Sequence, residues 1–137
     1  MKKFRLALGE LDTLCRYISD NFSSGVVILR GDLAAGKTTL VKGFVKHMGI
    51  DDEVTSPTFS LQQCYGKDIF HYDIYNHGLE HFISLGMLEE LERDGYHFVE
   101  WGDDKLVEIL TSVGMDVISI DIEKISADTR EYKVCIH

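Results

Sequence analysis

The stretch LRGDLAAGKTTL, residues 29–40, carries the strongest structural signal in the chain. It fits the pattern G-x-x-x-x-G-K-[ST], with Gly31, Gly36, Lys37 and Thr38 in the required places. The apolar, β-branched run VVILR before it predicts a buried strand, and the run TTLVKGFVKHM after it predicts a helix. A strand, a glycine loop and a helix in this order are the context that a phosphate-binding loop requires.

The residue types of the loop suit phosphate groups. Gly31 and Gly36 let the backbone turn tightly and bring its N–H groups toward phosphate oxygens, at a helix N-terminus whose dipole favours an anion. Lys37 supplies a positive charge to the β and γ phosphates, and the Thr38 hydroxyl is a suitable ligand for Mg²⁺. A chance match in a glycine-containing turn is the alternative, which the flanking strand and helix disfavour. The residues expected to contact the nucleotide are Leu33, Ala34, Ala35, Gly36, Lys37, Thr38 and Thr39.

Composition narrows the class of protein. The 137 residues are 45% hydrophobic, which fits one globular domain with a real core. The net charge of -9 argues against strong direct binding of nucleic acid, because that affinity comes from clustered lysine and arginine, and it suits a basic partner. The N-terminal sequence is not a convincing signal peptide and no long apolar run spans a membrane, so we expect a cytoplasmic protein.

Apolar periodicity predicts the remaining elements. Strands are expected at 2–8, 26–30, 68–75, 96–101, 115–122 and 130–137, with a further strand toward the end of 55–66. Helices are expected at 11–22, 38–48 and 104–110, and one or two short helices at 77–94, broken near Gly86. Together these predict a single P-loop NTPase-like α/β domain over residues 1–137, with a mixed β-sheet and helices on both faces.

Two carboxylates follow apolar runs that predict strands. Asp73 comes after one such run and Glu100 ends another. A carboxylate at a strand end can hold the Mg²⁺ shell or orient the attacking water, as a Walker B acid does. A surface aspartate in an exposed strand explains Asp73 equally well, and the residues alone do not order the two acids.

Other side chains have a functional and a structural interpretation. The hydroxyls of Thr55, Ser56 and Thr58 follow the loop's helix, where GTPase-like folds place a switch, but a turn that starts a strand needs the same residues. Trp101, the only tryptophan, suits contact with the nucleotide or a partner, and suits the rim of a core as well. His71 is interpreted as a packing or solvated residue, because no set of zinc ligands accompanies it.

The nucleotide and its chemistry are only partly defined by these residues. The N-K-x-D element that reads guanine is missing, which favours ATP. A small-molecule kinase needs arginines in a lid, and beyond the loop only Arg93 and Arg130 are at hand. A stand-alone kinase is therefore a weaker alternative than an ATPase or a module whose docking depends on nucleotide occupancy.

Three further stretches carry a resemblance to a known family. In order after GDLAAGKTTLVKGF come SPTFSL, HYDIY and VEWGD, and together they resemble the TsaE family, also called YjeE. Its members are small P-loop ATPases that help to make the threonylcarbamoyladenosine (t6A) modification of tRNA with TsaB and TsaD. The resemblance implies Mg-ATP as ligand, Glu100 with Thr38 at the metal, Asp73 in catalysis and Arg130 near the nucleotide.

The sequence departs from the family pattern at three positions. Ala34 stands where glycine is usual, Asn76 where arginine is usual, and Gly102 where proline is usual. These changes keep the loop and both acids, so the resemblance still implies a weak Mg-dependent ATPase that its partners TsaD and TsaB complete or stimulate. The departure at Asn76 removes a charge that would serve a partner or the phosphates.

Replacing Lys37 with alanine is expected to abolish ATP binding, because the change removes the positive charge that the loop offers to the β and γ phosphates. Equilibrium titration with ATP, monitored by calorimetry, measures this. An unchanged affinity would exclude residues 31–39 as the nucleotide site.

Overall fold

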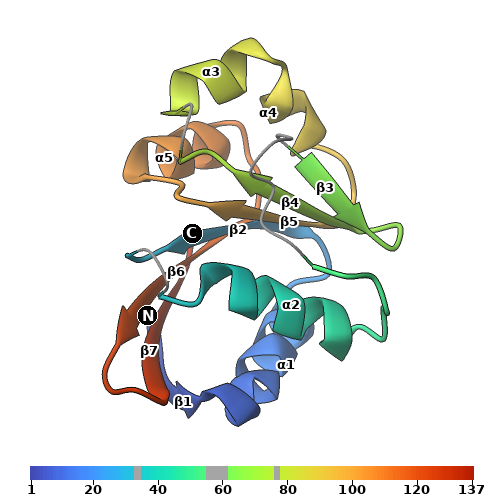
Figure 1. Ribbon diagram of the computed structural model, residues 1–137. Coiled ribbons are helices and arrows are strands. Elements are labelled where there is room, and N and C mark those ends of the chain that lie inside the picture. Colours follow the sequence, from blue (N-terminus) through green and yellow to red (C-terminus); the bar gives the residue numbers. More distant parts are fainter. Residues whose placement is uncertain (33–34, 55–61, 76–77) are drawn as a thin grey trace.

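A computed structural model describes residues 1–32, 35–54, 62–75 and 78–137 (Figure 1). The described strands join one sheet in the order β1-β7-β6-β2-β5-β4-β3. The strands are β1 (Lys2–Ala7), β2 (Gly25–Arg30), β3 (Gln62–Tyr65), β4 (Ile69–Asp73), β5 (Tyr96–Glu100), β6 (Val117–Lys124) and β7 (Thr129–Ile136). The helices are α1 (Leu11–Asn21), α2 (Lys37–His47), α3 (Gly78–Ser84), α4 (Met87–Glu90) and α5 (Asp104–Ser112), with a 3₁₀ turn, η1 (Leu8–Glu10), before α1.

The centre of the sheet is parallel and its edges are antiparallel. β2 runs parallel to β5 on one side and to β6 on the other, and β4 is parallel to β5. β1, β7 and β3 pair antiparallel with their neighbours. The central strands are largely apolar because helices cover both of their faces, and every residue of β5 is buried, His97 and Glu100 included. The predicted mixed α/β sheet is confirmed.

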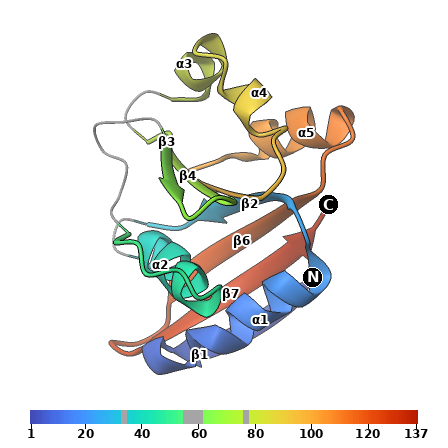
Figure 2. The same cartoon turned by 90° about the vertical axis from the view of Figure 1, so that its right-hand side faces the viewer.

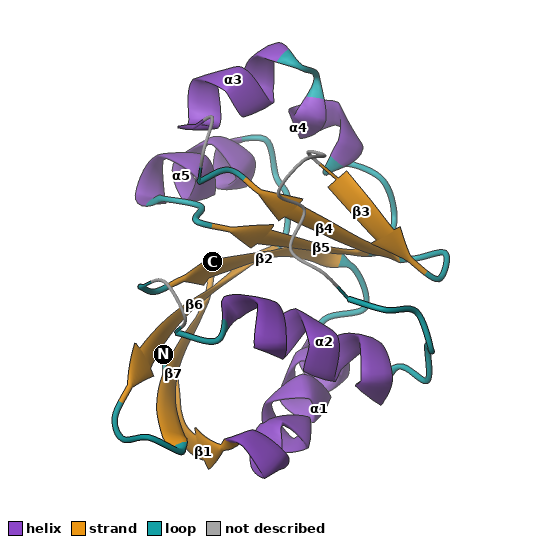
Figure 3. Ribbon diagram, in the orientation of Figure 1, coloured by secondary structure: helices purple, strands orange, loops and turns teal. Residues whose placement is uncertain are grey.

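Helices α1 and α2 cover one face of the sheet, and α3, α4 and α5 cover the other (Figures 1 and 2). Colouring by secondary structure shows the sheet between these two helical layers (Figure 3). Alternation along β5 sends Phe98 to the α1–α2 core and Val99 to the α3–α5 core. The same alternation aims Glu100 at the face that α2 covers, which places its carboxylate beside the phosphate loop.

The elements expected from periodicity agree with the structure apart from small shifts of their ends. The region 77–94 contains two short helices, and Gly86 separates them with a φ of 78°. η1 was not predicted, because three residues are too short for a periodic signal. Within the described ranges, no helix is long and apolar enough to cross a membrane.

Gly95 is the glycine whose replacement is expected to damage the fold most clearly. Its φ is 128°, and an added Cβ would lie 2.4 Å from the carbonyl oxygen of Asp68. We expect Gly95→Ala to cost about 1–2 kcal/mol from backbone strain and about 1–3 kcal/mol more from the clash. Gly114→Ala is the matched control, since its φ is 83° and an added Cβ meets no atom within 4 Å. Urea unfolding of both variants measures the difference, and equal losses would contradict the prediction.

Candidate functional site

The loop between β2 and α2 has backbone geometry that only glycine accepts at two positions. Gly36 precedes α2 with a φ of 113°, in the left-handed region. Gly31 has a φ of 154°, and a Cβ there would lie 2.6 Å from the carbonyl oxygen of Ile122. The two glycines therefore permit the turn that brings the chain from the end of β2 to the first residue of α2.

Lys37 folds back over this loop. Its Nζ donates hydrogen bonds to the carbonyl oxygens of Gly31, at 2.7 Å, and Asp32, at 2.9 Å. The ammonium group also lies 3.9 Å from the ring centroid of Trp101, a cation–π contact. The residue is only 5% exposed, so the charge is held in a largely desolvated position.

The environment of Lys37 affects its protonation in two directions. Burial lowers its pKa below the ordinary value of 10.5. The carboxylates of Glu100, Asp73 and Asp32 oppose this shift by favouring the charged ammonium. These acids therefore help to keep a positive charge where phosphate groups are expected.

Thr38 and the two candidate acids meet at the carboxyl edge of the parallel strands. Asp73 pairs with Glu100 in the register of β4 and β5. Thr38 Oγ1 donates a 2.8 Å hydrogen bond to Glu100 Oε2, and Glu100 is only 3% exposed. Asp73 Oδ1 accepts a 2.9 Å hydrogen bond from the backbone N–H of Tyr75. The structure thus places the Thr38 hydroxyl on Glu100, a contact that the sequence did not indicate.

These donors fit a magnesium ion that arrives with a nucleotide. A hydroxyl and a carboxylate are oxygen ligands of the kind that Mg²⁺ prefers, and Mg²⁺ takes its other ligands from phosphates and water. Among the described residues, no group of three or more His, Cys, Asp or Glu side chains is placed to hold a metal. The donor set therefore suits a metal that is shared with the phosphates.

His71 is the site residue that sequence analysis missed. It is fully buried, and its Nε2 lies 2.5 Å from Glu100 Oε2. Its Nδ1 lies 3.0 Å from the hydroxyl of Tyr65, in β3. The available signal was alternation, because His71 and Asp73 are separated by one residue in a strand and so share a face. Of the two interpretations of His71, packing agrees with its burial and solvation does not, and both omit its contact with an acid.

Trp101 follows Glu100 in an unusual backbone conformation. Its φ of 70° is the only positive value outside glycine in the described chain. Its backbone N–H donates a 2.9 Å hydrogen bond to the carbonyl oxygen of Leu29, and its ring centroid lies 4.6 Å from that of Tyr75. Such a conformation costs about 1–3 kcal/mol and is concentrated at functional sites. The turn holds the indole over Lys37, at the rim of the core.

Arg130 reaches the loop from β7. Its Nε donates a 3.1 Å hydrogen bond to the carbonyl oxygen of Ala35. Beside it is a cavity of about 310 Å³ that includes the exposed side chain of Thr39. The cavity is lined by Leu8, Gly36, Thr39, Ala127, Asp128, Arg130 and Tyr132.

The remaining candidates are placed elsewhere or not described. Leu33, Ala34, Thr55, Ser56, Thr58 and Asn76 lie outside the described residues. Arg93 contacts Glu90 and the ring of Phe70, in the α3–α5 layer. Gly102 is buried, and a Cβ there would lie 2.7 Å from Ile28 Cγ2, so this departure from the family pattern fits its surroundings.

Comparison with known proteins identifies the family. Residues 7–132 match the family model described as threonylcarbamoyl adenosine biosynthesis protein TsaE. The chain belongs to the TsaE family. The expected resemblance is thus confirmed over most of the sequence.

Relatives within the TsaE family include two curated bacterial proteins, each named tRNA threonylcarbamoyladenosine biosynthesis protein TsaE. The protein of Treponema pallidum is 39% identical over 100 residues, which cover 69% of this chain and 74% of that protein. The protein of Bacillus subtilis is 36% identical over 109 residues, which cover 77% of this chain and 66% of that protein. The crystal structure of YdiB from Bacillus subtilis superposes on this chain with a TM-score of 0.71 and 27% sequence identity. The match covers 99% of this chain and 86% of the YdiB chain.

The pKa of Lys37 is directly measurable by NMR of isotope-labelled lysine side chains. We expect its titration midpoint below 10.5, because burial disfavours the charged form. Glu100→Gln should lower the midpoint further, because the variant loses a carboxylate that favours the ammonium. Glu108→Gln, at an exposed position in α5, is the matched control and should leave the midpoint unchanged. A midpoint above 10.5 in the unaltered protein would contradict this account.

Proposed function

We propose that this protein binds and hydrolyses Mg-ATP as a subunit of the system that makes t6A in tRNA, acting with TsaD and TsaB. The observation that carries the proposal is the contact between Thr38 and the buried Glu100, beside Lys37 on a glycine loop. These are the groups that a P-loop NTPase uses for metal and phosphate. Membership of the TsaE family supports the choice of pathway.

Nucleotide binding is assigned to the loop and the cavity beside it. The backbone of residues 31–39 and the ammonium of Lys37 bind the phosphates, and Lys37 exchanges its hydrogen bonds to Gly31 and Asp32 for phosphate oxygens. The nucleoside is assigned to the cavity of about 310 Å³, where Thr39 and Arg130 supply polar groups. Its volume is at the small end of the usual range for ligand pockets, about 300–1,000 Å³.

The two acids are given different tasks. Glu100 and Thr38 hold Mg²⁺, since the hydroxyl and the carboxylate already lie together. When bound there, Mg²⁺ would supply positive charge to the phosphates. Asp73, opposite Glu100 on β4, is assigned to orienting the attacking water. The side chain of Trp101 restricts water around Lys37 and is suited to contact the nucleotide or a partner.

Slow hydrolysis by the isolated protein is expected from the positions of its arginines. Arg30 forms ion pairs with Asp104 and Asp121, Arg93 pairs with Glu90 in the other layer, and Arg130 bonds to Ala35. None of these three side chains is placed as an arginine finger, a group that typically accelerates hydrolysis by about 10³–10⁵. A partner is therefore proposed to complete or position the site, and the net charge of -9 suits a basic partner.

Release of phosphate from γ-labelled Mg-ATP tests this function. The protein alone is expected to be slow, and addition of TsaB and TsaD should raise the rate at least about tenfold, since a completed site stabilises the transition state. Lys37→Ala should abolish release, whereas Asp73→Asn should still bind ATP and lose about 10²–10⁴ in rate.

Three results would contradict parts of the proposal. Binding without release under all conditions, with Asp73→Asn still supporting tRNA modification, would instead favour a module controlled by nucleotide occupancy. Transfer of labelled phosphate to a substrate would favour a kinase. Failure of the unaltered protein to bind Mg-ATP would remove the proposed function altogether.

A further inference from the structure

Two buried histidines occupy neighbouring strands and form similar contacts on opposite faces of the sheet. His71 in β4 and His97 in β5 are both fully buried. Each has a tyrosine hydroxyl near its Nδ1, Tyr65 at 3.0 Å and Tyr72 at 2.8 Å respectively. The two side chains differ in what their Nε2 atoms contact, which makes one a natural control for the other.

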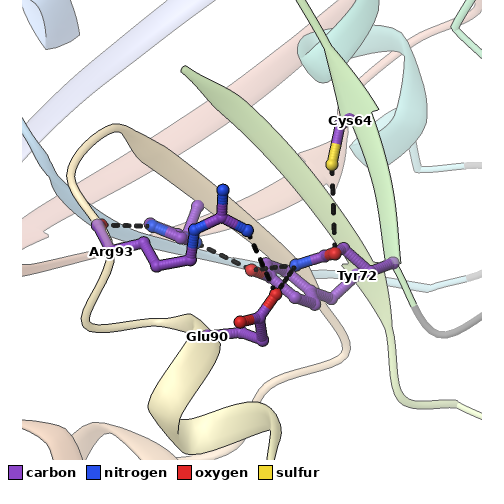
Figure 4. Close-up of polar contacts among 6 residues, drawn as sticks. Cys64, Tyr72, Glu90 and Arg93 are labelled. Atoms are coloured by element: carbon purple, nitrogen blue, oxygen red, sulfur yellow. Dashed lines mark hydrogen bonds and ion pairs between the residues drawn. The ribbon is translucent and has the colours of Figure 1, made fainter. Parts of the chain in front are cut away.

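The contacts around His97 lie on the face of the sheet that α3, α4 and α5 cover, where Figure 4 shows Tyr72, Glu90 and Arg93. His97 Nε2 donates to the carbonyl oxygen of Arg93 at 2.7 Å. The Tyr72 hydroxyl also accepts a 3.0 Å hydrogen bond from Gln62, whose amide reaches Glu90 at 3.1 Å. These contacts tie β3, β4 and β5 to α4, and the partners named here lie away from the phosphate site.

The His71 network instead ends on the proposed metal ligand. A carboxylate only accepts hydrogen bonds, so the 2.5 Å contact with Glu100 Oε2 requires the proton on His71 Nε2. On the other side of the ring, the Tyr65 hydroxyl lies 3.0 Å from Nδ1 and donates a 2.8 Å hydrogen bond to Gln63 Oε1. The same Oε2 accepts from Thr38 Oγ1 at 2.8 Å. Glu100 is thus held by donors from two elements, β4 and α2.

We infer that His71 is a positioning residue that fixes the Glu100 carboxylate for Mg²⁺, and that Tyr65 orients the His71 ring. This inference rests on the proposed function, in which Glu100 and Thr38 hold the metal. Rotation of a carboxylate about its last torsion is broad, so one donor leaves its orientation poorly defined. A second donor, from a fully buried ring, restricts that rotation.

The energetic reason is the burial of Glu100. At 3% exposure the carboxylate has little access to water, so each donor that it loses leaves a desolvated charge less well satisfied. Partners that orient metal ligands typically change metal affinity by about 10–100-fold when they are removed. His71 therefore acts on the metal through Glu100 and does not touch it.

The test measures metal affinity apart from turnover. Trp101 is the only tryptophan and contacts Lys37, so its fluorescence reports nucleotide binding. ATP is titrated first with a chelator present, and Mg²⁺ is then titrated at a fixed ATP concentration. The variants are His71→Leu, His71→Gln and Tyr65→Phe, and His97→Leu is the matched control for loss of a buried imidazole.

We expect His71→Leu to raise the Mg²⁺ midpoint by about 10–100-fold while ATP affinity in chelator changes less than about threefold. His71→Gln should recover part of the loss, because its amide N–H can donate to Glu100. Tyr65→Phe should give a smaller shift in the same direction. His97→Leu should lower thermal stability and leave the Mg²⁺ midpoint unchanged.

An unchanged Mg²⁺ midpoint in folded His71→Leu overturns the inference, as does an equal shift in His97→Leu. If His71→Leu does not fold, the Mg²⁺ midpoints of Tyr65→Phe and His71→Gln test the inference instead. An unchanged Mg²⁺ midpoint in both of these variants overturns the inference. Failure of the proposed function has a different signature, since the unaltered protein would then show no Mg²⁺ dependence of ATP binding.

Discussion

A positive and a negative side chain are buried at the carboxyl edge of the parallel strands. The site depends on the polar groups that surround these two charges. Lys37 and Glu100 are 5% and 3% exposed. An isolated buried charge is costly, so each is surrounded by groups of the opposite sign or polarity. Lys37 has two carbonyl oxygens and an aromatic face, and Glu100 has a hydroxyl and an imidazole. Glycine geometry, strand register and helix placement all bring these partners within reach.

The two faces of the sheet divide structural and chemical roles. Side chains that alternate along β4 and β5 send one set of polar groups toward α2 and another toward α4. On the α2 side the polar groups lie beside the phosphate loop, whereas the contacts described on the α4 side connect strands to a helix. The two buried polar networks have similar side chains but different roles, because the His71 network includes an acid beside the phosphate loop.

Local patterns predicted most of the fold, and contacts between distant residues account for what they missed. The glycine loop and its flanking strand and helix were defined by spacing within about a dozen residues. The hydrogen bond from Thr38 to Glu100 joins residues 62 positions apart. The partnership of His71 with Glu100 likewise requires knowing that β4 and β5 are neighbours. A single sequence shows the face on which a strand residue lies but not which strand lies next to it.

The pairing of β1 with β7 has a consequence for how the chain forms during synthesis. Lys2 pairs with Val134 and Ala7 with Thr129, so β1 lies beside a strand that is made long after it. At about 5–20 residues per second, β1 leaves the ribosome many seconds before its partner strand exists. Its N–H and C=O groups stay exposed during that interval, and an unpaired strand edge invites contact with other chains. Lys2, Lys3 and Arg5 in β1 repel a second copy of the same strand, which protects the nascent edge until β7 pairs with it.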